Sequence, residues 1–290
     1  MAIKDMLVLL DNGRPSSSPG TAASGSASLG PAPTAALDLA ARLGAHVTGV
    51  ALAVDPIVPG FVVAPLPVEV IEQARAQALA VADAAVAAFD AEATRLEVAH
   101  ETRTSEILMG GAPEGFAVAC RITDLVVIGQ DDPDRPEPMR ETLIETALFE
   151  GVAPTLLVPY ISKGKPSFDR VMIAWDGGRT AARAVQAAMP ILAMAEKITV
   201  VMVDRAGSDP GQPGADLATW LARHGLDVDV EQVEAPDISI ADALLDLAAD
   251  KSFDLLVMGG YGHSRVREFL LGGATRGILA SMTLPVLMAH

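Results

Sequence analysis

One pattern of strands and helices occurs twice in this chain, and the duplication limits the fold more than any other feature. Met-Leu-Val-Leu-Leu-Asp-Asn-Gly, which starts at Met6, matches Val-Met-Ile-Ala-Trp-Asp-Gly-Gly, which starts at Val171. Asp-Leu-Val-Val-Ile-Gly, which ends at Gly129, matches Asp-Leu-Leu-Val-Met-Gly, which ends at Gly259. Thr-Leu-Leu-Val at 155–158 matches Val-Leu-Met-Ala at 286–289. The chain is therefore predicted to consist of two related repeats.

Each repeat alternates short apolar runs with helical patterns, which is typical of a parallel sheet covered on both faces. We expect five strands and about four helices in each repeat, with the last strands, 155–158 and 286–289, packed together because edge strands need cover. The predicted strands are 6–10, 47–54, 98–103, 124–129, 155–158, 171–175, 198–203, 228–233, 254–258 and 286–289. The predicted domains are 1–160 and 169–290, joined by a linker at 161–168. The paired repeats would form an intramolecular pseudo-dimer, and a further homodimer stays open.

Charge and composition exclude several classes of partner. The formal net charge is −16, which argues against nucleic-acid backbones and anionic membranes. A single cysteine, Cys120, allows no internal disulfide and fits a reducing compartment. Its apolar neighbourhood indicates a core thiol. Uncharged apolar runs of membrane-spanning length and a secretory signal pattern are both lacking, so a cytoplasmic location is expected.

A glycine-rich loop follows the apolar run that ends at Gly259. Gly259, Gly262 and Gly272 have the spacing Gly-x2-Gly-x9-Gly, and the loop leads into a helical stretch at 274–281. A strand, a glycine loop and a helix N-terminus together form an arrangement that cradles phosphate with backbone N–H groups. The spacing is neither that of a P-loop nor that of the GxGxxG dinucleotide fingerprint. Turn formation alone is the alternative interpretation of these glycines.

This loop, together with Asp176 after the first strand of its repeat, resembles the universal stress protein family in its tandem, two-repeat form. The resemblance covers nearly the whole chain except 14–33, a Ser-, Gly- and Pro-rich stretch that we expect to be a loop. It implies an α/β fold of two tandem flavodoxin-like or Rossmann-like (HUP-type) domains. Each would be an open five-stranded parallel sheet with helices on both faces.

The resemblance also implies an adenine nucleotide site, for ATP or AMP and with Mg²⁺ as an optional companion, in the second repeat. Asp176 matches the position that contacts adenine or ribose. A residue of the second strand of that repeat lines the base, and Val201, Met202 and Val203 all remain candidates. Met258 and Gly259 match residues under the ribose. The phosphate loop is matched by Gly262, Gly272, Gly273, Ala274 and Thr275, the last of which matches its later hydroxyl. His263 is a candidate phosphate contact, and a solvated loop histidine is the favoured alternative.

Gly273 departs from the family pattern, which has Ser or Thr after the third glycine. The loss of one hydroxyl donor to phosphate costs on the order of 1 kcal/mol or somewhat more. Backbone N–H groups and the helix end remain, so weaker binding, or none, is predicted rather than loss of the site. Arg265, Arg267 and Arg276 outnumber Glu268 between 259 and 290, which suits an anion, although pairing of these arginines with acids elsewhere is an equal alternative.

The first repeat lacks the glycine loop and has acids in its place. Asp131 or Asp132 falls near Gly262, and Glu141, with one gap, falls near Gly272. Carboxylates where phosphates would lie are costly in a low-dielectric cleft, so we expect this repeat to be degenerate, with a structural or regulatory role. A metal site made of these acids is the weaker alternative. No metal ligand is assigned.

Three function classes follow. The first is a stress-response protein that binds ATP or AMP in its C-terminal repeat and acts through conformation or partners. The second is a dimerisation or interaction module that binds no nucleotide and has a vacated site. The third is an enzyme, at most a slow ATPase. No catalytic residue is assigned, because the sequence supplies neither a general base beside a phosphate nor a Mg²⁺ carboxylate beside the loop.

Overall fold

The structure is a computed structural model. It describes residues 2–11, 29–54, 67–107, 113–137, 139–204, 213–235, 237–261 and 273–290. The chain divides into two compact units, Ile3–Val152 and a second that includes Ala153–His290. Each unit is described by itself below.

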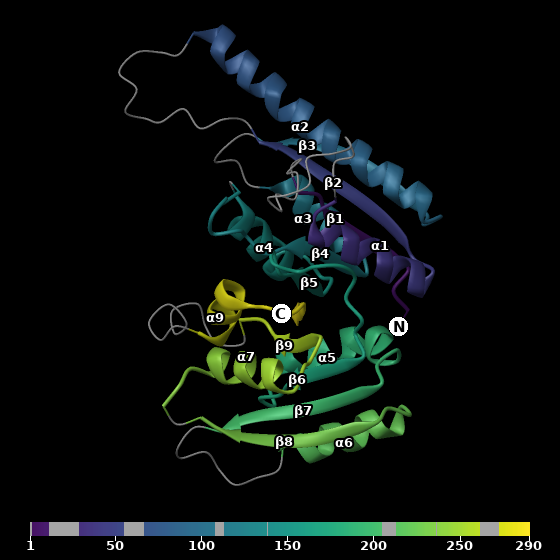
Figure 1. Cartoon of the computed structure of the whole chain (residues 1–290), viewed down its shortest axis with the longest axis vertical. Coiled ribbons are helices and arrows are strands. Elements are labelled where there is room, and N and C mark those ends of the chain that lie inside the picture. The colour runs from purple at the N-terminus through teal and green to yellow at the C-terminus, as the bar shows by residue number, and fades with distance from the viewer. Residues whose placement is uncertain are drawn as a thin grey trace. The chain divides into compact units, whose positions relative to one another are not determined.

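The unit Ile3–Val152 is built on a parallel sheet with the strand order β3-β2-β1-β4. Its strands are β1 (Asp5–Leu9), β2 (His46–Val54), β3 (His100–Ile107) and β4 (Leu125–Gly129), and its helices are α1 (Pro31–Leu43), α2 (Val68–Arg95), α3 (Glu114–Arg121) and α4 (Arg140–Phe149). The long helix α2 runs along β2 and β3 (Figure 1). Phe89 of α2 is fully buried, and its ring occupies the space over Gly49 of β2, where a Cβ would lie 2.8 Å from a ring carbon.

The unit Ala153–His290 has the strand order β5-β10-β9-β6-β7-β8. Its strands are β5 (Thr155–Val158), β6 (Arg170–Ala174), β7 (Lys197–Asp204), β8 (Val228–Glu234), β9 (Leu255–Gly259) and β10 (Val286–Ala289), and its helices are α5 (Arg179–Leu192), α6 (Pro213–Arg223), α7 (Ile240–Asp250) and α9 (Ala274–Ser281). All neighbouring strands are parallel except β5 and β10, which pair antiparallel. The predicted pairing of the two last strands is therefore confirmed.

The strands at the centre of each sheet are apolar because helices cover both of their faces. Every residue of β4 and β10 is buried, whereas β3 and β8 at the sheet edges carry polar side chains at most positions. This confirms the prediction of a parallel sheet covered on both faces.

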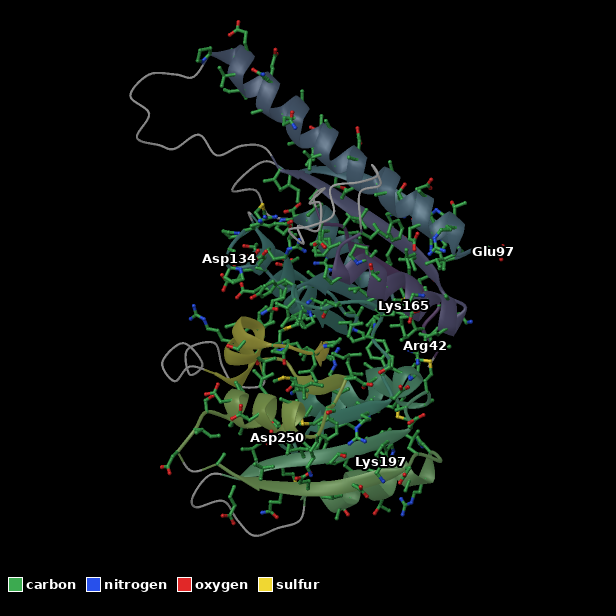
Figure 2. The ribbon with its side chains drawn as sticks, in the orientation of Figure 1. Arg42, Glu97, Asp134, Lys165, Lys197 and Asp250 are labelled. Carbon is green, nitrogen blue, oxygen red and sulfur yellow. The ribbon has the colours of Figure 1, made fainter. Side chains whose placement is uncertain are left out.

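The internal duplication extends to hydrogen bonds at the amino ends of the strands. The carboxylate of Asp124, just before β4, accepts the backbone N–H groups of Lys4 and Asp5 at 2.8 and 3.1 Å. The carboxylate of Asp254, just before β9, accepts two N–H groups at the start of β6, at 2.8 and 3.0 Å. Farther along the same edge, the Lys197 ammonium at the start of β7 pairs with Asp227 at 2.9 Å (Figure 2).

Helix α1 begins earlier than the sequence predicted. The stretch 14–33 was expected to be a loop, but α1 starts at Pro31 and includes Pro31 and Pro33. Proline fits the first turn of a helix, since its missing N–H would have no partner there and its φ is already helical. Gly30 is the N-cap, with φ −63° and ψ 171°, and the remainder of the expected loop up to residue 28 lies outside the described residues.

Candidate functional site

In the unit Ala153–His290, the carboxyl ends of β6, β7 and β9 meet at one edge of the sheet. Ala174 of β6 is in register with Val201 of β7, and Ile173 is in register with Val257 of β9. Strand β6 lies between β7 and β9. The chain passes from β6 through α5 to β7 on one side, and it returns to the other side of β6 only at β9. In an open α/β sheet, such a switch point is where ligands bind.

Asp176 follows β6 at this switch point and is exposed. Its Oδ1 accepts the backbone N–H of Gly178 at 2.7 Å, which closes a tight turn around Gly177, whose φ is +73°. Gly178 is the N-cap of α5. A Cβ at Gly178 would lie only 2.8 Å from Asp176 Oδ1, so a larger residue there would displace this carboxylate. The turn thus fixes the orientation of the carboxylate at the head of α5.

Gly259, the last residue of β9, lies directly under the first turn of α5. A Cβ at this position would lie 2.5 Å from Thr180 Oγ1 and 2.6 Å from the backbone nitrogen of Ala181. Only glycine lets the helix pack this closely on the end of the strand. The glycine that the sequence assigned to a ribose contact therefore also has a packing role, because it brings the α5 N-terminus to the carboxyl end of β9.

The beginning of the glycine loop is fixed by backbone hydrogen bonds. Gly260 donates its N–H to Ala289 O at 2.9 Å, and His290 Nδ1 lies 3.1 Å from Gly260 O. Tyr261, whose φ is +51°, donates its N–H to Thr275 Oγ1 at 3.1 Å. Sequence reasoning missed Tyr261 and His290 as parts of this site, because neither belongs to the glycine spacing.

Thr275 is 3% exposed, and its hydroxyl joins the first turn of α9 to the start of the loop. The sequence matched this hydroxyl to a phosphate contact. Its oxygen already accepts a hydrogen bond from the protein, while its own proton can still be donated. Gly273 is the N-cap of α9, with φ −58° and ψ 152°, and no side chain caps the helix. These angles are open to any residue.

The helix caps and the last strands give different alignments of the two repeats. Met139 is the N-cap of α4, as Gly273 is of α9. Counted from the helix caps, Glu141 corresponds to Thr275. Counted from the first residues of β5 and β10, it corresponds to Gly272, as predicted from the sequence, so its placement stays a prediction.

The predicted base-lining residues of β7 separate into two groups. Met202 is 8% exposed and lies against α6, where a Cβ at Gly214 would be 2.8 Å from its sulfur. Val201 and Val203 point to the opposite face, since successive side chains alternate along a strand. Val201 is 1% exposed, whereas Val203 is half-buried, so Val203 is the more accessible of the two.

The other predicted site residues lie on or near β9 and α9. Met258 is 6% exposed, and Ala274 begins α9. Gly262, His263 and Gly272 lie outside the described residues.

In the unit Ile3–Val152, an ion cluster lies at the corresponding edge. Arg140 Nη2 donates to Asp11 Oδ1 at 2.9 Å and also pairs with Glu137. The arginine is 3% exposed. Burial lowers the pKa of Arg140, but the two carboxylates outweigh this effect and raise it above its ordinary value. The acids of the first repeat are therefore partly neutralised from within the protein, which the sequence did not reveal.

The other acids of the first repeat hold the loop before α4. Asp131 Oδ1 accepts the N–H of Glu137 at 2.8 Å, and Asp132 Oδ1 accepts the N–H of Asp134 at 3.0 Å. Their roles are those of turn-forming side chains. Over the part of the chain that the structure describes, no group of three or more His, Cys, Asp or Glu residues is arranged to hold a metal ion.

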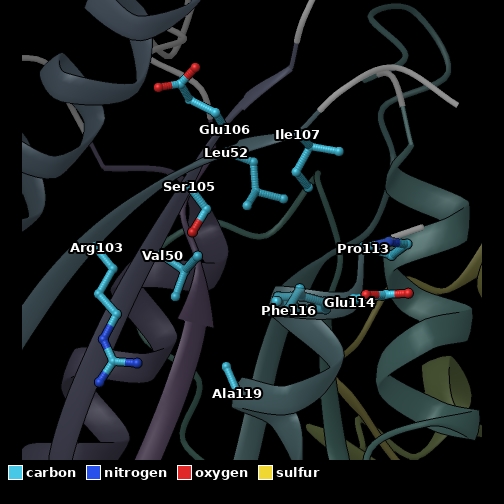
Figure 3. A pocket seen from close by; sticks show the side chains of 11 residues that line it. Val50, Leu52, Arg103, Ser105, Glu106, Ile107, Pro113, Glu114, Phe116 and Ala119 are labelled. Carbon is cyan, nitrogen blue, oxygen red and sulfur yellow. The ribbon is translucent and has the colours of Figure 1, made fainter. Parts of the chain in front are cut away.

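A pocket of about 440 Å³ lies elsewhere in the same unit, between β2, β3 and α3 (Figure 3). Val50, Leu52 and Phe116 form an apolar part of its lining, and Arg103 and Glu114 contribute charged groups. None of the residues that the sequence assigned to nucleotide binding lines it.

Within the described residues, no helix is long and apolar enough to cross a membrane.

The fold defines a tandem α/β protein with a topological switch point in its C-terminal repeat. Residues 167–290 match the family model described as "Universal stress protein family". Universal stress protein Slr1230 of Synechocystis sp. is 29% identical over 138 residues, which cover 46% of this chain and 46% of that protein, so the match spans about half of the relative's length. The C-terminal repeat of this chain is therefore similar to the universal stress protein family over residues 167–290.

Solved structures extend the likeness of fold to the whole chain. A universal stress protein from Archaeoglobus fulgidus DSM 4304 has a TM-score of 0.65 at 14% identity and covers 98% of this chain and 95% of its own. A universal stress protein in complex with cAMP is 26% identical and covers 42% of this chain and 96% of its own, with a TM-score of 0.34. The full-length match confirms that the chain folds as two α/β halves of this family's type.

Proposed function

We propose that the C-terminal repeat binds an adenine nucleotide, ATP or AMP, and that the protein acts in a stress response through conformation or partners. The observation that carries the proposal is the convergence of Asp176 with two helix N-termini at one switch point. Gly259 lies under the first turn of α5, and the loop that follows it is hydrogen-bonded to the first turn of α9. Each helix N-terminus adds about half a positive charge, which favours an anionic ligand.

Each described residue then has a definite role. The exposed carboxylate of Asp176 accepts a hydrogen bond from the adenine or the ribose. Val203 lines the base, and Val201, Met258 and Gly259 shape the strand edge beneath the sugar. The backbone N–H groups at Gly273 and Ala274 face the phosphates, and Thr275 donates its hydroxyl proton. We assign no catalytic step to these residues, and Mg²⁺ would be held chiefly by the phosphates.

Asp176→Asn tests the proposal with the turn preserved. The amide oxygen of asparagine still accepts the N–H of Gly178, so the turn before α5 remains, whereas the negative acceptor for the ligand is lost. Hydrogen bonds to charged groups are worth about 1.5–3 kcal/mol, so the Kd for ATP should rise about 10- to 100-fold. Isothermal titration, with and without Mg²⁺, measures this change.

Asp250→Asn is the matched control. Asp250 is exposed at the end of α7, at the opposite edge of the sheet from the switch point, and its substitution removes the same charge (Figure 2). Mass spectrometry of the purified protein should detect carried-over adenine nucleotide. A protein that carries none and binds neither ATP nor AMP at millimolar concentration would contradict the proposal and favour an interaction module with a vacated site.

A further inference from the structure

The ion cluster of the first repeat occupies the positions that form the proposed nucleotide site in the second. Asp11 follows β1 as Asp176 follows β6, and Gly129 ends β4 as Gly259 ends β9. Arg140 is the first residue of α4, where α9 has Ala274. The same three elements therefore meet at the same edge in both repeats, and in the first repeat the residue that begins the last of the three, the helix α4, is an arginine.

The Arg140 guanidinium extends from the start of α4 across the end of β4 to the end of β1. A Cβ at Gly129 would lie 3.3 Å from Asp11 Oδ1 and 4.0 Å from Arg140 Nη1, so both groups lie directly over that glycine. Arg140 reaches Asp11 at 2.9 Å and also pairs with Glu137, which is three residues before it. The side chain thereby bridges the cleft in which a ligand would lie.

Arg140 Nη1 is buried and has no hydrogen-bond partner among the described residues. A surface with a full set of acceptors would pair this nitrogen, because leaving a buried donor unsatisfied is costly. Both carboxylates pair with Nη2 of the guanidinium, whereas Nη1 meets no acceptor among the described residues. The unpaired Nη1 indicates that Arg140 occupies the site and does not complete a hydrogen-bond network there.

We propose that Arg140 is a built-in occupant of the first repeat's cleft, and that this one position, arginine in α4 and alanine in α9, determines which repeat can take a nucleotide. The second clause rests on the proposed function, whereas the first stands without it. The side chain of Ala274 ends at Cβ and cannot bridge to Asp176, so the first residue of α9 does not close the second cleft as Arg140 closes the first.

Chemical rescue tests the first clause. Arg140→Ala should lower the melting temperature, because Asp11 and Glu137 lose their shared cation. Methylguanidinium at low millimolar concentration should then bind between the two carboxylates and raise the midpoint of this variant by about 2–4 °C, with little effect on the wild-type protein. Calorimetry measures both shifts. Absence of rescue in a folded Arg140→Ala protein overturns the clause.

Two controls separate occupancy from loss of an ordinary ion pair. Arg140→Met retains an apolar side chain in the same space, so it should fold but show no rescue, and it serves where the alanine variant is too unstable. Arg42→Ala removes an exposed arginine that lies 4.0 Å from Asp38, and it too should show no rescue. Equal effects of methylguanidinium on the Arg140→Ala and Arg42→Ala proteins would overturn the proposal.

Transfer of the arginine tests the second clause. Ala274→Arg should close the second cleft by pairing with Asp176 and weaken ATP binding at least 100-fold, whereas Ala280→Arg, which adds the same charge at an exposed position of α9, should change it less than threefold. Unchanged ATP affinity in Ala274→Arg overturns the clause. If the wild-type protein binds no nucleotide, the proposed function and this clause fail together, and the rescue experiment decides the first clause alone.

Discussion

Replacing Gly273 with serine restores the hydroxyl that the nucleotide loop lacks, and the structure indicates that the backbone allows it. Gly273 has φ −58° and ψ 152°, so serine can take its place without strain. It is the N-cap of α9, and no side chain caps that helix. Serine there can accept a backbone N–H of the first turn, or donate to a phosphate when a ligand is bound.

The expected gains differ between stability and affinity. Serine in place of an N-cap glycine gains a few tenths of a kcal/mol, and the loss of glycine's freedom in the unfolded chain adds about 0.4–1 kcal/mol. Together they predict an increase in the free energy of unfolding of about 0.5–1.5 kcal/mol. A hydrogen bond to a charged phosphate is worth about 1.5–3 kcal/mol. Since ordering of the loop offsets part of this, we expect ATP to bind about tenfold more tightly.

Isothermal titration with ATP and with adenosine, next to urea unfolding, separates the two effects. Adenosine has no phosphate and should bind equally well to both proteins. Gly115→Ser is the matched control, because a Cβ at this exposed position of α3 meets nothing within 4 Å, so it adds a hydroxyl far from the loop. An equal gain for ATP and adenosine, or a loss of both, would refute the assignment of Gly273 to phosphate binding.

Three further predictions concern the two units. Gly259→Ala should lower the free energy of unfolding by about 1–3 kcal/mol in urea, because its Cβ would lie 2.6 Å from a backbone nitrogen in the first turn of α5. His100 has a pKa raised by its hydrogen bond to Val98 O, which outweighs burial, and by Asp90. It should therefore add stability that is fully present below about pH 6.5 and is lost as the pH rises through the raised pKa. Burial raises the pKa of Cys120 to about 12, so a thiol reagent at pH 8 should modify it only after unfolding.

Each of these predictions has an outcome that would contradict it. For Gly259→Ala, it is an unfolding midpoint equal to that of Gly115→Ala, whose added methyl meets nothing. For His100, the test is the stability difference between wild type and His100→Gln, and a difference that grows from pH 6 to pH 9 has the wrong sign. For Cys120, modification within minutes in the native protein would show that the helix α3 opens readily.

The sequence alone determined the repeat architecture and the position of the candidate edge. Apolar runs such as Leu125–Gly129 and Leu255–Gly259 are local signals, since strands buried on both faces must be apolar along their whole length. The aspartate after each first strand and the glycine at the end of each later one could likewise be aligned by eye. The family resemblance placed Asp176 and Gly259 in one site, and in the structure they lie at the carboxyl ends of the neighbouring strands β6 and β9.

Only the tertiary structure decided how each edge is filled. Arg140 reaches Asp11 across 129 positions of sequence, and Thr275 accepts the N–H of Tyr261 across 14. Periodicity carries no information on such pairs, because side-chain reach depends on where helices begin and on how loops of unequal length return. The sequence placed acids in the first cleft. The fold placed Arg140 between Asp11 and Glu137, where its charge offsets the cost of bringing two partly buried carboxylates together.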